Sequence, residues 1–220
     1  MKKISVVTGT RAEYGLLKPL IKSLNDDSDF DLQLMATAMH LSSEYGMTVN
    51  EIINDGFPIV KKIKCLNDTD SAVGISKSIS VALSSFALAF EEIKPELIII
   101  LGDRTEMLAV AIAASIANIP IAHIQAGDKS GHIDDISRSA IAKYSHIHFS
   151  SCEDSSNRLI NWGEEKLRIF EYGAPQLDDI ASKIKRNYIK ENFFIVLFHP
   201  VLSETKNLNY QMDNLIGALK

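Results

Sequence analysis

The segment from position 123 to position 138 reads HIQAGDKSGHIDDISR and gathers many ionisable side chains directly after an apolar run. Its two glycines loosen the backbone, while Asp128, Asp134 and Asp135 crowd three carboxylates into one loop. Carboxylates that lie near one another push their pKa values apart, so that one can act as an acid while another acts as a base. The segment therefore predicts a site for acid/base chemistry.

Simpler roles for the same residues remain open. Asp134 precedes a set of apolar residues at helical spacing, so it could be the N-cap of a helix. Asp135 could then favour the positive end of that helix, and both roles can coexist with catalysis. His123 lies inside the apolar run, where a histidine is more often a core residue than a catalyst.

Arginines follow two other apolar runs. GTRAEYG (9–15) places Arg11 at the expected start of a helix, where backbone N–H groups and a guanidinium would suit a phosphate, although an ordinary turn looks the same. GDRTEM (102–107) places Asp103 as a candidate acid, base or hydroxyl acceptor and Arg104 as a candidate phosphate ligand. Alternatively, Asp103 merely caps the next helix. Neither segment matches a GxGxxG or Walker A motif.

Histidines supply the other candidates. His199 ends the apolar run FFIVLFHP and could transfer a proton from a strand end. His146 and His148 alternate in HIHFSS, but no carboxylates stand at a convincing ligand spacing, so we expect no metal site.

The apolar runs that must position these residues are mostly continuous, which is typical of parallel strands buried on both faces. We expect strands at 4–9, 32–38, 96–103, 119–127, 146–151, 167–173 and 193–200. Helical spacing is found at 16–24, 78–93, 106–118, 137–145 and 155–163. The alternation predicts an α/β fold, a Rossmann-like doubly wound parallel sheet, whose loops after the strands meet at one edge.

The expected organisation is a Rossmann-like domain at 1–180, a linker at 181–192 and the start of an incomplete second Rossmann-like domain at 193–220. One strand and one helix cannot form a sheet of their own. The strand expected at 193–200 therefore either joins the first sheet as an edge or begins a second domain.

Composition narrows the class of partner. The chain has 220 residues, 46% of them hydrophobic and 23% charged, which is typical of a soluble globular protein. A net charge of -5 argues against nucleic-acid binding but not against a small phosphorylated ligand. The first apolar run is too short for a signal peptide or a membrane span, and Cys65 and Cys152 look like isolated thiols. We therefore expect a cytoplasmic protein without membrane association.

Taken together, GTRAEYGLL, HLSSEYG, GDRTEMLAVAIAA, HIQAGDKSGHIDDISRSAIAKYSHIHF, GAPQLDD and the late HP resemble the hydrolysing UDP-N-acetylglucosamine 2-epimerases, in particular their sialic-acid and legionaminic-acid pathway branch. The resemblance implies two Rossmann-like domains of the glycosyltransferase-B type with the active site between them. It also implies elimination of the nucleoside diphosphate to a glycal, followed by addition of water with inversion at C2. No cofactor, no obligatory metal and a homodimer are further implications.

The resemblance also assigns residues. Catalytic roles go to Asp103, Asp134 and His199, with Asp128 sharing the acid/base work. The candidate substrate-binding residues are Arg11, Glu13, Tyr14, His40, Arg104, Gln125 and Arg138.

The sequence also departs from the family at several positions. Gln125 stands where many members have glutamate, and a neutral amide cannot act as a general base. Asp128 stands where the sialic-acid branch often has glutamate, Ser139 where it often has histidine, and Leu16 where the other branch has lysine. These changes suggest a variant sugar, such as a deoxy or diacetamido sugar.

Family members are considerably longer than this chain, so we expect the chain alone to lack epimerase activity. Two alternatives remain. One is a glycosyltransferase of the same architecture, and the other is a non-catalytic truncated fragment that binds a nucleotide sugar.

Overall fold

The computed structural model describes residues 1–67, 71–131, 134–178, 193–200 and 202–219, and the chain divides into two compact units, Met1–Ile184 and Lys185–Lys220. The predicted linker, 181–192, lies outside the described residues. The predicted domain boundaries stay a prediction.

One seven-stranded sheet, in which all strands are parallel, forms the centre of the first unit. Its strands are β1 (Lys2–Thr8), β2 (Phe30–Thr37), β3 (Ile59–Ile63), β4 (Leu97–Leu101), β5 (Ile121–Ile124), β6 (Ile147–Ser150) and β7 (Ile169–Glu171). They lie in the order β3-β2-β1-β4-β5-β6-β7. The predicted doubly wound α/β class is confirmed.

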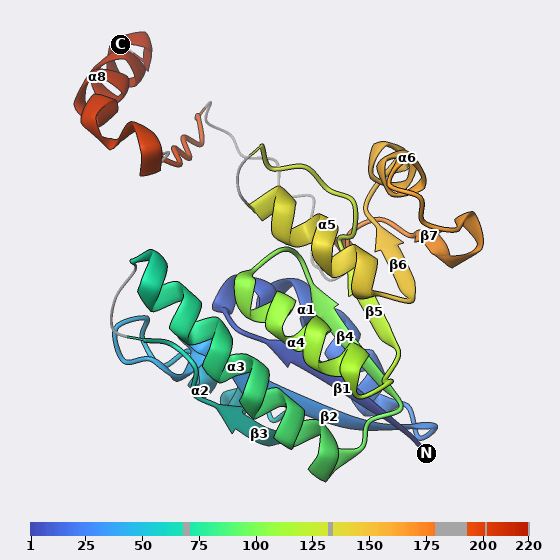
Figure 1. Cartoon of the computed structure of the whole chain (residues 1–220). Coiled ribbons are helices and arrows are strands. Elements are labelled where there is room, and N and C mark those ends of the chain that lie inside the picture. The colour runs from blue at the N-terminus through green and yellow to red at the C-terminus, as the bar shows by residue number, and fades with distance from the viewer. Residues whose placement is uncertain (68–70, 132–133, 179–192, 201, 220) are drawn as a thin grey trace. The chain divides into compact units, whose positions relative to one another are not determined.

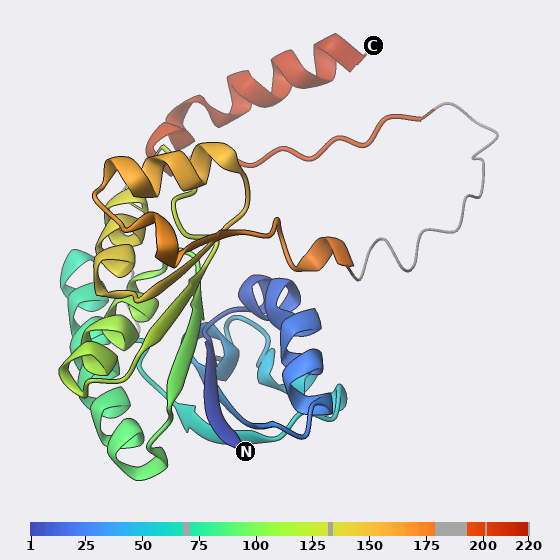
Figure 2. The same ribbon diagram turned by 90° about the vertical axis from the view of Figure 1, so that its right-hand side faces the viewer.

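Helices cover both faces of this sheet. They are α1 (Arg11–Asp26), α2 (Val49–Asn54), α3 (Ala72–Ile93), α4 (Thr105–Ile116), α5 (Asp134–Tyr144) and α6 (Glu153–Asn161), with short 3-10 turns η1 (Ala38–Leu41) and η2 (Lys166–Arg168). Figure 1 shows α3, α4 and α5 side by side, and Figure 2 shows α1 on the opposite side of the strands.

The two faces have separate hydrophobic cores because side chains alternate along a strand. Val6 packs with Leu17 and Ile21 of α1, whereas its neighbour Val7 packs with Phe86 and Met107 on the other face. All six side chains are fully buried. This double burial explains why the strands appear as continuous apolar runs.

The chain reverses its direction across the sheet between β1 and β4. β1 pairs with β2 on one side and with β4 on the other, where Ile4 lies opposite Leu97. In open α/β sheets this switch point is where a crevice forms between diverging loops. The loop Gly9–Thr10 after β1 and the loop Gly102–Arg104 after β4 therefore flank the expected binding position.

The long helix α3 (Ala72–Ile93) is apolar enough in composition to cross a membrane. Its residues Ala82, Phe86 and Phe90 are nevertheless buried in the core of the first unit. Only 28% of its most apolar stretch is buried, so these core contacts account for only part of its apolar character.

The strand expected at 193–200 is a wrong prediction. These residues form neither strand nor helix, and they do not join the seven-stranded sheet. A strand needs a neighbour for its backbone hydrogen bonds, and an apolar sequence cannot replace that neighbour. The other described residues of the second unit, 202–219, form η3 (Leu202–Asn207) and α8 (Leu208–Leu219).

Candidate functional site

A capping box builds the loop after β1. The Thr10 hydroxyl accepts the Glu13 backbone N–H at 3.2 Å, and Glu13 Oε2 accepts the N–H groups of Gly9 at 2.7 Å and Thr10 at 2.9 Å. Burial raises the pKa of Glu13 to about 7, although the Gly9 hydrogen bond opposes this. The Glu13 carboxyl is thus buried and hydrogen-bonded to the backbone of the loop. Its predicted contact with substrate stays a prediction.

Arg11 and Tyr14 of α1 are directed towards α2 and the residue that follows it. Arg11 Nε lies 3.2 Å from Glu51 Oε1, and both side chains remain well exposed. The Tyr14 hydroxyl donates to Asp55 Oδ2 at 2.6 Å, and burial together with this carboxylate raises the Tyr14 pKa. Arg11 can therefore turn to an anion at little cost, whereas Tyr14 is already bound within the protein.

His40 is enclosed by threonines. Its Nε2 lies 3.1 Å from the Thr8 hydroxyl and its Nδ1 lies 2.8 Å from the Thr48 hydroxyl. The ring is fully buried, and this burial lowers its pKa to about 4. His40 is thus a neutral ring that holds η1 against β1, and its predicted contact with substrate stays a prediction.

On the other side of the switch point, Asp103 forms an ion pair with Arg138, which joins the loop after β4 to α5. Burial raises the Asp103 pKa, the Arg138 charge opposes this, and the charge of Asp134 adds to the rise. Arg138 also donates from Nη1 to the Asp128 backbone carbonyl at 2.8 Å. The buried Arg138 guanidinium therefore connects two other predicted site residues, Asp103 and Asp128.

The carboxylates of the 123–138 segment have different surroundings. Asp128 accepts hydrogen bonds from the hydroxyls of Ser155 at 2.6 Å and Ser151 at 3.3 Å. Asp135 accepts the backbone N–H groups of Ser130 at 2.7 Å and Gly131 at 2.8 Å. These hydrogen bonds fix the loop and lower the Asp135 pKa.

Asp134 is the first residue of α5 and is exposed. The alternative role of Asp134 as an N-cap stays a prediction, because residue 133 lies outside the described residues. Of the three carboxylates in this loop, the one on Asp134 is the most open to a ligand.

The backbone at the start of this loop is constrained. Gln125 adopts a left-handed conformation with φ 57°, which is uncommon for a residue with a side chain. Gly127 has φ 77°, and a Cβ there would collide with the Ser155 carbonyl oxygen. His123 is a core residue, as its apolar surroundings predicted, since Nε2 lies 2.6 Å from the Gly102 carbonyl and burial lowers its pKa to about 3.

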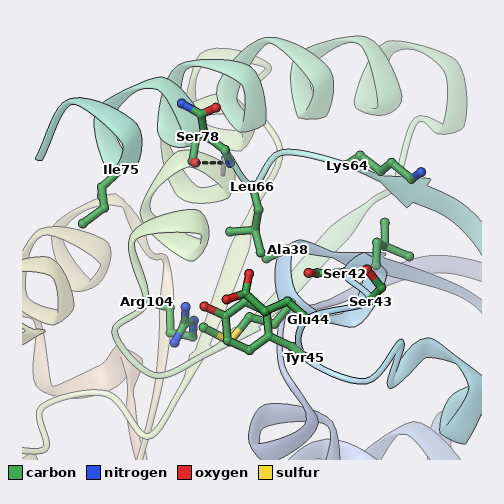
Figure 3. Close-up of a pocket in the computed structure, with 13 residues that line it drawn as sticks. Ala38, Ser42, Ser43, Glu44, Tyr45, Lys64, Leu66, Ile75, Ser78 and Arg104 are labelled. Atoms are coloured by element: carbon green, nitrogen blue, oxygen red, sulfur yellow. Dashed lines mark hydrogen bonds between the residues drawn. The ribbon is translucent and has the colours of Figure 1, made fainter. Parts of the chain in front are cut away.

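Arg104 lies between the two sides. Its Nε donates to Glu106 Oε1 at 2.8 Å, and its side chain lines a cavity of about 380 Å³ above the carboxyl ends of β2 and β3. Figure 3 shows this cavity with Arg104, Lys64 and the 42–45 segment around it. His199 belongs to the second unit, so its part in the site stays a prediction.

Sequence analysis missed the residues that hold the predicted ones in place. These partners are Thr48, Glu51, Asp55, Glu106, Ser151 and Ser155. Glu106 stands within the quoted motif GDRTEM and Ser151 ends the quoted segment HIHFSS, but neither was singled out. In the described ranges, no group of three or more His, Cys, Asp or Glu side chains is placed to hold a metal ion.

Comparison with known proteins gives the family. The profile described as UDP-N-acetylglucosamine 2-epimerase matches residues 22–220. The chain is 39% identical to the UDP-N,N'-diacetylbacillosamine 2-epimerase (hydrolyzing) of Legionella pneumophila, over 99% of the chain and 60% of that relative. It is 37% identical to the GDP/UDP-N,N'-diacetylbacillosamine 2-epimerase (hydrolyzing) of Campylobacter jejuni, over 99% of the chain and 59% of that relative.

Solved structures agree with this similarity. UDP-GlcNAc 2-epimerase from Neisseria meningitidis, bound to UDP-GlcNAc, matches with a TM-score of 0.71 and 24% identity, over 83% of this chain and 49% of that one. The Methanocaldococcus jannaschii enzyme in complex with UDP-GlcNAc and UDP matches with a TM-score of 0.69 and 26% identity, over 83% of this chain and 51% of that one. The predicted glycosyltransferase-B-like fold class is confirmed. The chain spans about 60% of the length of the curated relatives.

Proposed function

The chain belongs to the UDP-N-acetylglucosamine 2-epimerase family, and we propose that it is part of a hydrolysing 2-epimerase of a UDP-N-acetylglucosamine-type nucleotide sugar. The observation that carries the proposal is the Asp103–Arg138 ion pair at the switch point of the sheet, where a ligand crevice is expected. It brings a carboxyl with a raised pKa next to the Arg138 cation of α5 and near the Arg104 cation of its own loop. Acid/base chemistry beside an anionic leaving group needs this combination.

The proposed reaction has two steps. In the first, a carboxylate removes the proton from C2 while the bond between C1 and the diphosphate oxygen breaks, which leaves a C1–C2 double bond. In the second, water adds its hydroxyl to C1 and a proton reaches C2 on the opposite face. The products are the nucleoside diphosphate and a free N-acetylmannosamine-type sugar.

Each side of the switch point has a part in this proposal. The C2 proton has no adjacent carbonyl to acidify it, so departure of the diphosphate must supply much of the driving force. Arg11 and Arg104 would stabilise the charge that develops on the leaving phosphates. Asp103 and Asp134 would exchange protons with the sugar, and His199 of the second unit would assist.

The base at C2 is assigned to Asp134 rather than Asp128. Both carboxylate oxygens of Asp128 already accept serine hydroxyls. Asp134 is exposed and its charge acts on Asp103. We propose that Asp128 instead supports Arg138 through its backbone carbonyl.

The substrate we favour is a diacetamido sugar, because the Legionella and Campylobacter relatives are named for one and because Gln125 departs from the family pattern. A place in sialic- or legionaminic-type sugar biosynthesis, a cytoplasmic location and a homodimer in the longer protein follow from the same proposal. Residues 193–220 would then begin a second Rossmann-like domain, and the 220-residue chain alone would be inactive.

The test is incubation with UDP-N-acetylglucosamine and with its diacetamido analogue in deuterated water. It is run on this chain and on the longer product obtained when the coding frame is read beyond Lys220. NMR should show a free 2-epimerised sugar with deuterium at C2 from the longer product only. Transfer of the sugar to an acceptor without deuterium would indicate a glycosyltransferase, and steady release of free sugar by this chain would refute its proposed inactivity.

A further inference from the structure

Glu106 has a contact that its position in the helix does not require. It stands in the first turn of α4, where any carboxylate is favoured by the positive helix end. Its side chain is only 6% exposed and turns back, so that Oε1 accepts Arg104 Nε at 2.8 Å and Oε2 lies 3.2 Å from the Thr105 hydroxyl. The carboxylate thus holds one edge of the Arg104 guanidinium.

The other edge of that guanidinium is open. In residues 1–67, 71–131 and 134–178, neither terminal amino group of Arg104 has a hydrogen-bond partner, and the side chain is 34% exposed at the wall of the 380 Å³ cavity. Lys64 and Glu44 also line this cavity and carry opposite charges, so Arg104 makes its net charge positive (Figure 3).

A second acid lies behind this pair. Gly9 packs so tightly that an added Cβ would meet Glu13 Oε2 at 3.2 Å and Glu106 Cγ at 3.5 Å. Glu13 Oε1 is buried and, within the described ranges, has no hydrogen-bond partner. The loop after β1 and the start of α4 therefore meet through two carboxyl groups and one arginine.

We propose that Glu106 is a positioning residue that fixes Arg104 so that its two terminal amino groups bind an anionic group in this cavity. The inference rests on the proposed function only in taking that group to be the leaving diphosphate. It extends the function by assigning a role to Glu106, which touches no substrate. A bidentate guanidinium needs such a hold, because a free arginine side chain loses much rotamer freedom on binding.

Glu13 gives the proposal a pH signature. Burial and the Glu106 charge raise the Glu13 pKa and the Arg104 charge lowers it, which leaves the pKa at about 7. His40, which lies nearby on η1, is neutral and held by threonines. An anion on Arg104 weakens the lowering effect, so anion binding raises the Glu13 pKa further. Affinity for the anion should then fall as the pH rises above about 7, with uptake of a proton.

The experiment measures binding of inorganic pyrophosphate to this chain by calorimetry between pH 6 and pH 8.5, in buffers of different ionisation enthalpy. Arg104→Ala should abolish binding. Glu106→Ala should weaken it about tenfold, because the guanidinium loses its hold. Glu106→Gln keeps an acceptor for Nε, so it should restore affinity to within about threefold while moving the pH dependence to lower pH. Glu91→Ala, on an exposed part of α3, is the matched control.

Several outcomes would overturn the proposal. One is tenfold weakening by Glu91→Ala as well, and another is an unmoved pH dependence in Glu106→Gln, which would make Glu106 merely structural. If Glu106→Ala does not fold, the comparison of Glu106→Gln with the unchanged chain decides. Pyrophosphate binding requires no turnover, so the role of Glu106 can be confirmed even if no epimerised sugar is found. Conversely, epimerised sugar can be found even if pyrophosphate affinity does not depend on Glu106.

Discussion

On the β1 side of the switch point Glu13, Tyr14 and His40 are buried and hydrogen-bonded within the protein, whereas on the β5 side a loop holds carboxylates near the surface. His40 has both ring nitrogens within hydrogen-bond distance of threonines, and Glu13 accepts two backbone N–H groups. Asp134, by contrast, is exposed, and Asp103 is paired with a single arginine.

The difference is one of solvation. Burial lowers the His40 pKa to about 4 and raises the Glu13 pKa to about 7, so neither side chain is charged between these two pH values. On the β5 side the Asp103 carboxyl can exchange a proton with a molecule that approaches it. We infer that the β1 side positions an anion and that the β5 side carries the proton transfers. Each of the following predictions tests that division.

The largest effect is expected for Asp103→Asn in the longer product. An amide keeps the size of the side chain but cannot take up a proton, so turnover should fall about 10²–10⁴-fold, the usual share of a general acid or base. The measurement is the rate of free sugar release by NMR. Glu91→Gln, which removes a carboxylate from an exposed part of α3, should leave the rate unchanged. A loss below about tenfold for Asp103→Asn would contradict a proton-transfer role on the β5 side.

Gly127→Ala should be the most destabilising change. The residue has φ 77°, and the new Cβ would meet the Ser155 carbonyl oxygen and Leu159. Strain and collision together should lower the free energy of unfolding by about 3–5 kcal/mol. The measurement is urea denaturation followed by circular dichroism.

Gly131→Ala is the matched control within the same loop. Its φ is 81°, but a Cβ there meets nothing within 4 Å, so the cost should be about 1 kcal/mol. Equal losses of unfolding free energy in the two variants would show that Gly127 is not packed against α6. The loop would then not differ in packing between Gly127 and the exposed Gly131.

Glu13→Gln tests the buried side through pH. The unfolded chain ionises Glu13 near its usual pKa of 4.5, whereas the folded chain holds the proton up to about pH 7. The folded state thus binds more protons in this window, and the Glu13 contribution to stability is lost as the pH rises from 4.5 to 7. The loss should reach about 2–3 kcal/mol.

The variant should lack this loss, because glutamine can keep the capping box without titrating. Denaturation free energies of both proteins at pH 5, 6 and 7.5 give the comparison, in which the titration of His40 and His123 cancels. Parallel pH profiles would mean that Glu13 is not held in its neutral form.

The sequence predicted the doubly buried strands and the edge strand β7 but missed β3, the strand at the other edge of the sheet. β1, β4 and β5 form continuous apolar runs, and all three were expected. β3 (Ile59–Ile63) was missed because Lys61 and Lys62 interrupt its apolar character, as an edge strand allows. Residues 193–200 were overpredicted because no local pattern reveals whether a neighbouring strand exists.

The site was predictable as a list of residues but not as a set of contacts. Asp103 and Arg138 are 35 positions apart, and they meet because β4 and β5 are neighbours in the sheet. The enclosure of His40 depends on Thr8 and Thr48, which come from separate segments. Such partners are fixed by the order of strands, which the spacing of polar residues does not contain.

The smallest effect is expected for Ser155→Ala, which tests whether Asp128 is a support rather than a reacting group. Ser155 is buried and donates to Asp128 Oδ1 at 2.6 Å, so its loss should cost about 1 kcal/mol of unfolding free energy. Ser139→Ala removes a hydroxyl that, within the described ranges, bonds only the Ile136 carbonyl of its own helix, so stability should change by less than about 0.5 kcal/mol. If Ser155→Ala instead abolished turnover in the longer product while stability stayed unchanged, Asp128 would belong with the reacting carboxylates, and the base at C2 would have to be reassigned.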